Sequence, residues 1–313
     1  MKPAEAPEVL VLGGGGILGL AWMSAVLAGL DEGRSFDARE CGSFIGTSAG
    51  SIVAASLAAG ISPATGLGRL TRRAAVKLEG DKDGATAVRQ AFDALAGLGS
   101  SAAAPLASLA FSSTAAGGAL LRRAALRRVP AGRRSLDDLG RMIERTGASW
   151  DGRLRVAAVE LESGRRVMFG APGAPDVAVS TAVQASCAIP GVFRPVSAGG
   201  HTYVDGGAWS PTNMDTAEVQ RGDRVVCLNP TGSLRPGIGA LAGALGPVSR
   251  GIAAAEALAL KHRGAVVSAI NPDEESAAAM GMNLMNPSRR EAVIEAGIAQ
   301  GRRIAARDWR QAA

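Results

Sequence analysis

Two apolar runs, each followed at once by glycines, constrain the fold of this chain more than any other feature. Residues 9–12 read Val-Leu-Val-Leu and lead into four glycines at 13–16, and the strand-like residues 43–46 lead into a second glycine-containing turn at 46–50. A helix over residues 17–32 would join them. A strand, a turn, a helix and a second strand form a βαβ unit, whose right-handed crossover places both strands parallel in one sheet. Both glycine turns should therefore lie at the sheet edge where open α/β folds bind ligands.

The second turn has a serine at its centre. Gly46-Thr47-Ser48-Ala49-Gly50 is a Gly-x-Ser-x-Gly sequence between an apolar strand and a helix-like segment. This is the nucleophile-elbow pattern, in which a sharp turn lifts the serine hydroxyl clear of the sheet and the small neighbours avoid clashes. We therefore predict that Ser48 is a nucleophile and that Gly46 and Gly50 shape its elbow.

The first turn offers main-chain N–H groups at the start of a helix, where glycines and the helix dipole favour an anion. Its sequence has a second interpretation, because Gly14-x-Gly16-x-x-Gly19 also matches the dinucleotide-binding pattern. A dinucleotide site would need an acidic residue at the end of the second strand, where residues 46–48 are Gly-Thr-Ser. Nucleotide binding is therefore the weaker alternative.

The remaining chain alternates apolar strands with amphipathic helices. Strands are predicted at 154–161, 165–169, 202–204, 224–228 and 265–270, and helices at 63–95, 102–128, 135–147, 176–187, 251–262 and 288–308. This alternation predicts an α/β fold of three layers, α/β/α, with a mostly parallel central sheet. We expect a single domain over residues 1–313, with a helical, cap-like insertion over 63–135.

Cysteine usage and the chain start indicate a reducing, intracellular environment. Cys41, Cys187 and Cys227 lie far apart without a C-x-x-C pair, so neither a disulfide framework nor a zinc site is indicated, and we expect no metal or other cofactor. The first residues lack the basic start and apolar stretch of a secretory signal. Residues 94–121 are uncharged but rich in alanine, glycine and serine, which makes them a poor spanning helix. We expect a cytoplasmic protein.

The formal net charge of +6 favours anionic partners, either lipid headgroups or nucleic acid. Part of this charge is concentrated in one stretch of six arginines: Arg122, Arg123, Arg127, Arg128, Arg133 and Arg134. A solvated helix face is the simpler interpretation of such a stretch, and peripheral contact with an anionic membrane is the alternative.

A serine hydroxyl is a weak nucleophile until a base takes its proton, so the chain must supply a partner. Asp205 begins an Asp-Gly-Gly sequence at the end of a predicted strand, although such a sequence on its own is more often a hairpin turn. His262 would give the order Ser, Asp, His of α/β-hydrolases, but their elbow usually follows several strands and not the second. His201 lies four residues before Asp205 on an extended segment, about 13 Å away, which is too far for a pair.

The motifs together resemble those of patatin-like phospholipases. The glycine loop, the Gly-Thr-Ser-Ala-Gly elbow, the run Ala-Ser-Cys-Ala-Ile-Pro-Gly-Val-Phe at 185–193 and the Asp-Gly-Gly turn occur in that family's order and spacing, and the resemblance extends from about residue 8 to 230. It implies a Ser–Asp dyad without a catalytic histidine, with Ser48 as the nucleophile and Asp205 as the general base.

The resemblance also implies an oxyanion hole and a substrate class. The glycine loop, chiefly Gly14, Gly15 and Gly16, corresponds to the family's oxyanion hole, and the geometry of the elbow adds the amide of Ala49. The implied activity is hydrolysis of a lipid or another acyl ester through an acyl-enzyme, of phospholipase A or general esterase type. No nucleic-acid partner is expected for such an enzyme.

Two positions depart from the family pattern. The glycine loop of the family commonly reads Gly-Gly-Gly-x-Arg/Lys-Gly, and Leu18 occupies the basic position here. The stretch after Asp205 reads Ser-Pro-Thr-Asn at 210–213, where relatives often have asparagine before proline. The missing cation leaves a second hypothesis open, that of a catalytically silent lipid-binding or regulatory protein with the same fold.

Overall fold

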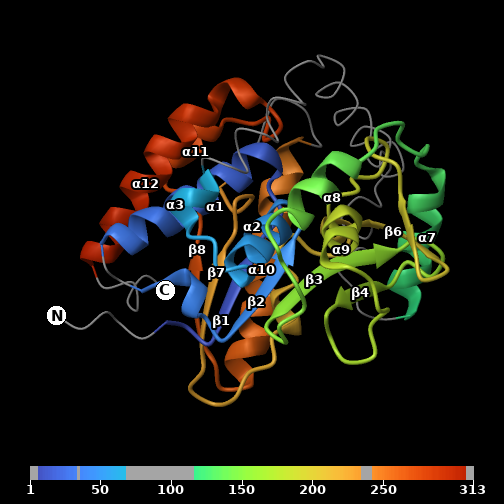
Figure 1. The fold of residues 1–313 in the computed structure, drawn as a ribbon, viewed down its shortest axis with the longest axis horizontal. Coiled ribbons are helices and arrows are strands. Elements are labelled where there is room, and N and C mark those ends of the chain that lie inside the picture. The colour runs from blue at the N-terminus through green and yellow to red at the C-terminus, as the bar shows by residue number, and fades with distance from the viewer. Residues whose placement is uncertain (1–5, 34–35, 68–115, 234–241, 308–313) are drawn as a thin grey trace.

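The computed structural model describes residues 6–33, 36–67, 116–233 and 242–307, which form an eight-stranded sheet with helices on both faces (Figure 1). The strands are β1 (Val9–Leu12), β2 (Ser43–Thr47), β3 (Leu154–Glu160), β4 (Arg166–Phe169), β5 (Val196–Ala198), β6 (His201–Asp205), β7 (Arg224–Leu228) and β8 (Val266–Ile270). The helices are α1 (Gly16–Glu32), α2 (Ala49–Ala58), α3 (Pro63–Gly66), α7 (Ala116–Arg128), α8 (Asp137–Glu144), α9 (Val179–Ser186), α10 (Ala242–His262), α11 (Glu274–Met280) and α12 (Arg290–Ala306). The three-layer α/β/α arrangement is confirmed.

The sheet has a parallel part and an antiparallel edge. Its order is β5-β6-β3-β2-β1-β7-β8, with β4 also paired to β3. The five strands from β3 to β8 in that order are parallel, whereas β4, β5 and β6 pair antiparallel. In the middle, Leu12 at the end of β1 lies beside Gly46 on one side and Leu228 on the other. The glycine loop and the elbow, which follow Leu12 and Gly46, therefore leave the sheet side by side.

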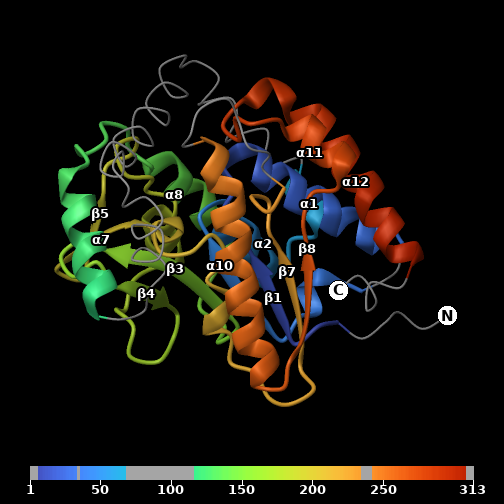
Figure 2. The same cartoon turned by 180° about the vertical axis from the view of Figure 1, so that it is seen from behind.

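Alternate residues of the strands build two cores. Leu10 of β1 points into the larger core, which contains buried residues of α1, α2, α9 and α12. Val9 and Val11 point to the opposite face, where Leu260 of α10 covers them. Figure 2 shows α10 lying across that face of the sheet. Because most residues of the central strands β1, β2, β3 and β7 are buried, these strands read as largely apolar runs, as is typical of covered parallel sheets.

Helix α12 is an integral part of the larger core. It packs along α1 (Figure 1) through glycines, and a Cβ atom added to Gly301 would lie only 2.3 Å from the carbonyl oxygen of Val26. The indole of Trp22 donates a hydrogen bond of 2.9 Å to the side chain of Gln300 across the same contact. The last helix therefore closes the layer that holds α1 in place.

The structure differs from the sequence-based expectations at several elements. The short strand β5 and the helix α11 were not predicted, and β6 pairs antiparallel with β3 although its direction could not be assigned from the sequence. The expected helix over 63–95 is described only as α3, because residues 68–115 lie outside the described residues. The cap-like insertion over 63–135 therefore stays a prediction. Among the described helices, none combines the length and apolar character needed to cross a bilayer.

Candidate active site

Pairing along one edge of β3 brings Ser48 and Asp205 together. Ala157 of β3 pairs with Thr47, the last residue of the parallel strand β2, and the next residue, Ala158, pairs with Asp205 of the antiparallel strand β6. Strand β4 occupies the other edge of β3, so β2 and β6 share one edge and run toward each other along it. The last residues of β2 and β6 therefore lie next to each other, and Ser48 directly follows the last residue of β2, Thr47.

The backbone turns sharply at Ser48. Ser48 has φ 51° and ψ −122°, a backbone conformation that residues other than glycine rarely adopt. It directly precedes the first residue of α2. Gly46 and Gly50 are required by close backbone approaches. A Cβ atom on Gly46 would lie 2.5 Å from the Cα of Ser51, and one on Gly50 would lie 1.9 Å from the carbonyl oxygen of Leu12. The turn therefore depends on both glycines of the elbow sequence.

The Ser48 hydroxyl donates a hydrogen bond of 2.7 Å to Oδ2 of Asp205. Both side chains are almost buried, at 8% and 5% exposure respectively. The other carboxylate oxygen of Asp205 accepts a 2.7 Å bond from the amide of Gly207. Burial raises the pKa of Asp205 to about 6, although the bonds from Ser48 and Gly207 act to lower it. The pair thus consists of a hydroxyl and a carboxylate that is more basic than an ordinary aspartate.

The glycine loop lies against the elbow. A Cβ atom on Gly14 would be 3.5 Å from that of Ser48, so only a residue without a side chain leaves this space open. The amides of Gly15, Gly16 and Ala49 have no acceptor within the part of the chain that the structure describes, and Gly16 has a positive φ of 58°. Gly14 differs from the expectation, because its amide donates a 2.8 Å bond to a carbonyl oxygen of the loop at 210–216, and is thereby occupied.

Leu18, at the position that is basic in related loops, belongs to the core. Its side chain is fully buried, and its amide donates a 3.0 Å bond to the carbonyl oxygen of Leu284. Met285 lies next to Gly16, whose added Cβ atom would be 2.6 Å from the methionine sulfur. The segment between α11 and α12 therefore packs against the glycine loop, in which Leu18 replaces the basic residue of related loops.

Two residues of the run at 185–193 contact the elbow in ways that the sequence did not reveal. The hydroxyl of Ser186 accepts a 2.8 Å bond from the amide of Ser48. The thiol of Cys187 lies 3.8 Å from the hydroxyl of Ser51 in α2. Burial raises the pKa of Cys187 far above its usual value, so this thiol stays protonated and serves as packing. The order and spacing of the motifs indicated that this run belongs to the site, but they did not indicate these two contacts.

Neither of the two histidines reaches the pair. His262 is exposed at the carboxyl end of α10, four residues before β8 begins. It therefore lies at the end of the sheet where the parallel strands start, whereas Ser48 lies where they finish. His201 is half-exposed, and its Nδ1 lies 2.8 Å from Oε1 of Glu160. The order Ser, Asp, His found in the sequence is therefore not assembled into a triad.

Among the described residues, one group of side chains has its oxygen and nitrogen atoms close enough together to be compared with a metal site. Glu160, Glu162 and His201 bring their ligand atoms within 4.8 Å of one another, but these side chains are partly or fully exposed and the histidine is already paired with Glu160. Exposed acidic groups of this kind commonly occur without an ion. Nothing at this group indicates a cofactor, and it contains neither Ser48 nor Asp205.

Comparison with known proteins identifies similar folds. A family model described as patatin-like phospholipase matches residues 10–218, a range that contains both Ser48 and Asp205. The type III effector ExoU is similar at 15% identity, over 98% of this chain and 54% of its own, with a TM-score of 0.43. VipD from Legionella pneumophila is similar at 15% identity, over 96% of this chain and 67% of its own, with a TM-score of 0.45.

Full-length ExoU from the type III secretion system of Pseudomonas aeruginosa, solved in complex with full-length SpcU, is 19% identical over 94% of this chain and 52% of its own, with a TM-score of 0.34. This chain thus spans about half of the length of ExoU. No curated protein matches it.

Proposed function

Because this chain belongs to the patatin-like phospholipase family, we propose that it is a lipid acyl hydrolase that cleaves its ester substrate with a dyad of Ser48 and Asp205. The observation that carries the proposal is the 2.7 Å hydrogen bond between the Ser48 hydroxyl and the buried Asp205 carboxylate. A nucleophile and a base within hydrogen-bond reach are what covalent catalysis by serine requires. The bond from Gly207 would keep the carboxylate turned toward the serine.

In the first half-reaction, Asp205 accepts the proton of the Ser48 hydroxyl while the oxygen attacks the ester carbonyl carbon. The tetrahedral intermediate collapses to an acyl-enzyme, and the alcohol leaves with the proton held by Asp205. In the second half-reaction, Asp205 takes a proton from water, which attacks the acyl-enzyme, and that proton returns to Ser48 as the carboxylic acid leaves. One carboxylate serves both steps, and its pKa of about 6 suits a base near neutral pH.

The negative charge of the tetrahedral intermediate needs donors on the side of the glycine loop. We assign this role to the amides of Gly15, Gly16 and Ala49, which have no acceptor among the described residues. The amides of Gly16 and Ala49 belong to the first turns of α1 and α2, so both helix dipoles would favour the anion. Gly14 contributes the open space beside Ser48 and not its amide.

A fluorophosphonate probe and ester turnover test the proposal together. Wild-type protein should gain one adduct by intact mass and hydrolyse a short acyl ester, whereas Ser48→Ala should do neither. Asp205→Asn should lose turnover by a factor of about a thousand or more, because the base is removed without a change of shape. His262→Ala provides the matched control and should retain normal turnover.

Two outcomes would contradict this mechanism in different ways. Loss of turnover in His262→Ala would favour the α/β-hydrolase alternative. If well-folded wild-type protein takes no adduct and hydrolyses no ester, the alternative of a catalytically silent lipid-binding protein would be favoured. The buried Leu18, which stands in place of a cation, is the feature that supports this alternative. Hydrolysis measured across phospholipids, neutral lipids and simple esters, with Ser48→Ala as background, would define the substrate class.

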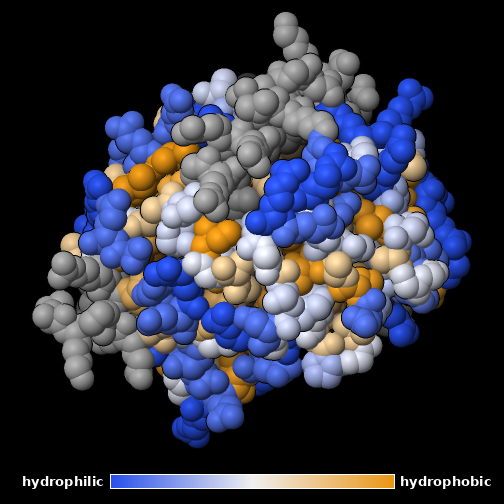
Figure 3. Space-filling view, in the orientation of Figure 1, coloured by the Kyte–Doolittle hydropathy of each residue, from blue (hydrophilic) through white to orange (hydrophobic). Residues whose placement is uncertain are grey.

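Helix α7 is the part of the described surface that best suits peripheral contact with an anionic membrane. Its residues Leu120 and Leu121 are 61% and 59% exposed, and Arg127 and Arg128 are exposed one to two turns further along. The helix contains no acidic residue. Figure 3 shows that the edge of the molecule where α7 lies is largely hydrophilic. Leucines beside arginines are the combination that binds anionic lipid surfaces.

The inner face of α7 connects this surface to the dyad. Arg122 was expected to share the basic face, but it is fully buried, with its guanidinium 3.9 Å from the centre of the Trp209 ring. Leu126 packs in the same small core as Trp209 and Val204, the neighbour of Asp205. A membrane bound at the outer face of α7 would thus be separated only by this helix from the segment that carries the general base.

Vesicle sedimentation tests this surface. Vesicles containing phosphatidylglycerol should bind the wild-type protein, and binding should fall about tenfold or more when Leu120 and Leu121 are both changed to serine. Leu258→Ser is the matched control, because Leu258 is an equally apolar side chain that is 54% exposed on a different helix, α10. Equal losses for the double variant and the control, or equal binding to vesicles of phosphatidylcholine alone, would contradict the assignment to α7.

A further inference from the structure

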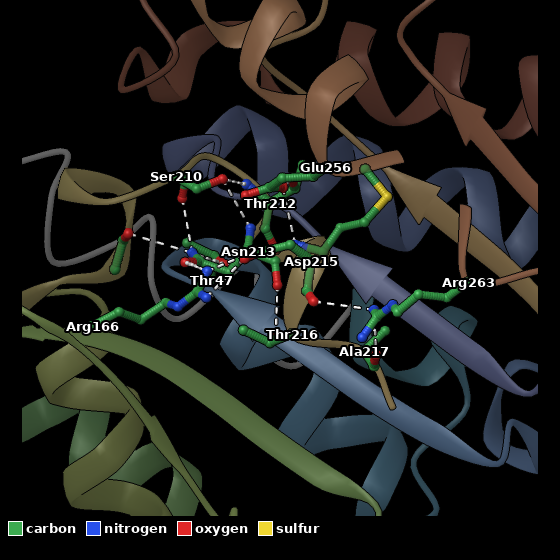
Figure 4. A network of polar contacts seen from close by, with 12 residues as sticks. Thr47, Arg166, Ser210, Thr212, Asn213, Asp215, Thr216, Ala217, Glu256 and Arg263 are labelled. Carbon is green, nitrogen blue, oxygen red and sulfur yellow. Dashed lines mark hydrogen bonds and ion pairs between the residues drawn. The ribbon is translucent and has the colours of Figure 1, made fainter. Parts of the chain in front are cut away.

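The loop over residues 210–216 contacts all three parts of the proposed site, and Figure 4 shows its contacts with Thr47, Arg166 and Glu256. The carbonyl oxygen of Pro211 accepts the 2.8 Å bond from the amide of Gly14 in the glycine loop. The carbonyl oxygen of Thr212 accepts a 3.3 Å bond from the hydroxyl of Thr47, the residue before the nucleophile. The loop itself begins five residues after Asp205. It therefore lies where the glycine loop, the elbow and the acid turn meet.

Asn213 makes the densest set of these contacts. Its side-chain nitrogen donates to the hydroxyl of Thr47 at 3.0 Å and to the carbonyl oxygen of Ser210 at 2.8 Å, and lies 3.4 Å from the carbonyl oxygen of Gly206. Asn213 is fully buried. One amide group thus joins the strand that ends in the nucleophile to the turn that follows the base.

The direction of these bonds requires an amide donor at position 213. The hydroxyl of Thr47 donates its proton to the carbonyl oxygen of Thr212, so it can only accept from Asn213. The other partners of the amide nitrogen are carbonyl oxygens, which also only accept. A carboxylate in place of the amide would set acceptor against acceptor, and a shortened side chain would leave buried polar groups without partners.

Asn213 is itself held from several sides. Its φ of 52° lies in the left-handed region, which asparagine tolerates better than most residues. Its side-chain oxygen accepts a 3.3 Å bond from Arg166, which also makes two bonds of 2.6 and 2.8 Å to Asp215. The hydroxyl of Ser210 accepts a 3.0 Å bond from the amide of Asn213.

A buried carboxyl group on α10 also holds the loop in place. Glu256 accepts a hydrogen bond from the hydroxyl of Thr212 and one of 3.0 Å from the amide of Met214. These residues flank Asn213 on both sides. The loop is therefore anchored both to α10 and to Arg166 of β4, and these contacts leave the side-chain amide of Asn213 little freedom to move.

We propose that Asn213 is a positioning residue, whose side-chain amide holds the elbow and the acid turn at the separation that lets Ser48 meet Asp205. It touches neither substrate nor the reacting atoms and acts through Thr47 and the carbonyl oxygens of Gly206 and Ser210. The inference rests on the proposed dyad. A misplacement of catalytic groups by about 1 Å can lower turnover a hundredfold, so loss of this contact affects chemistry more than substrate binding.

Steady-state kinetics of variants on both sides of the contact test the proposal. Asn213→Gly keeps the left-handed backbone and removes the amide, Asn213→Asp keeps the shape and removes the donor, and Thr47→Val removes the acceptor. Each should lower kcat by about 10- to 100-fold and change KM by less than about twofold. Thr47→Ser keeps the hydroxyl and should retain most of the activity.

Arg263→Gln is the matched control, because Arg263 donates bonds of 3.2 and 2.8 Å to the carbonyl oxygens of Asp215 and Ala217 at the far end of the same loop. It should retain kcat within about twofold. The double variant Thr47→Val with Asn213→Gly should be no slower than the slower single variant, since both remove one interaction. Circular dichroism identifies a temperature at which all variants are folded. If Asn213→Gly does not fold, the comparison of Thr47→Val with Thr47→Ser provides the test.

Normal kcat in Thr47→Val and Asn213→Gly, multiplicative losses in the double variant, or an equal loss in Thr47→Ser and Thr47→Val would overturn the positioning role. Wild-type protein and Ser48→Ala are measured in the same series. A wild-type protein no faster than Ser48→Ala would overturn the proposed function, whereas full activity in the Asn213 variants would overturn this inference alone.

Discussion

At Asp205, burial and hydrogen bonding act on the pKa in opposite directions. Burial is the larger effect and raises the pKa to about 6, and the bonds from Ser48 and Gly207 lower it in part. Because the mechanism requires the ionised carboxylate, kcat/KM should rise with pH and level off above about pH 6. A pH–rate profile on a short, uncharged ester measures this limb. A limb near pH 4, the value of an exposed aspartate, would contradict the buried carboxylate as the base.

The backbone at Ser48 stores strain that a pair of variants can measure. Ser48→Gly and Ser48→Ala both remove the hydroxyl and its bond to Asp205, but only glycine adopts φ 51° with ψ −122° without cost. Such strain is on the order of 1–3 kcal/mol, and the greater freedom of glycine in the unfolded chain offsets up to about 1 kcal/mol of it. Urea unfolding should therefore show Ser48→Gly to be more stable than Ser48→Ala by about 1 kcal/mol. Equal stability would mean that the strain at Ser48 does not exceed the entropic cost of glycine, about 1 kcal/mol.

Among the helices, the contact between α1 and α12 depends on residues without side chains. An alanine at Gly301 would place its Cβ 2.3 Å from the carbonyl oxygen of Val26, so the helices would have to separate. Gly301→Ala should lower the free energy of unfolding by roughly 1–3 kcal/mol, the usual cost of overpacking. Chemical denaturation monitored by circular dichroism measures the change.

Gly251 on α10 is the control for this prediction. It is exposed within a helix, and an added Cβ there meets nothing within 4 Å. Gly251→Ala should therefore raise the free energy of unfolding by about 0.5–1 kcal/mol, because alanine favours helix. Destabilisation by both substitutions to a similar extent would show that the close contact at Gly301 is not the cause.

The parallel strands were predictable because their sequences are largely apolar, and because β1 and β2 in addition lead into glycine turns. The direction of β6 was not predictable, because nothing in the sequence of residues 202–204 indicates whether this strand is parallel or antiparallel to its neighbour. Only the pairing along the shared edge of β3 shows that β6 and β2 meet end to end. The motif order placed Ser48 and Asp205 in one site, as the structure has them. It could not reveal Asn213, whose importance arises from a contact with Thr47, which is distant in sequence, and from one with Gly206. Nor could it show that the Gly14 amide is occupied, because the partner belongs to another loop.

At the scale of the whole molecule, two buried carboxyl groups among the described residues have raised pKa values, and this should shape the stability of the protein between pH 5 and 8. Burial raises the pKa of Asp205 to about 6, and burial together with the nearby Asp215 raises that of Glu256 to about 7. Between the ordinary values near 4 and these raised values, the folded state binds more protons than the unfolded chain. Stability from these groups is therefore fully present below about pH 4 and is lost as the pH rises through 6 and 7.

The expected loss is on the order of 1–3 kcal/mol for each group between pH 5 and 8, at about 1.4 kcal/mol per pKa unit. The carboxyl groups whose pKa is lowered, such as Asp37 beside Arg39, act below about pH 4 and do not mask this slope. Urea unfolding of wild-type protein at pH 5, 6, 7 and 8 measures it. Glu256→Gln keeps an oxygen that can accept from Thr212 and Met214, and should reduce the slope by roughly half. A stability that is flat or rises over this range would show that neither buried carboxyl group holds its proton in the folded state.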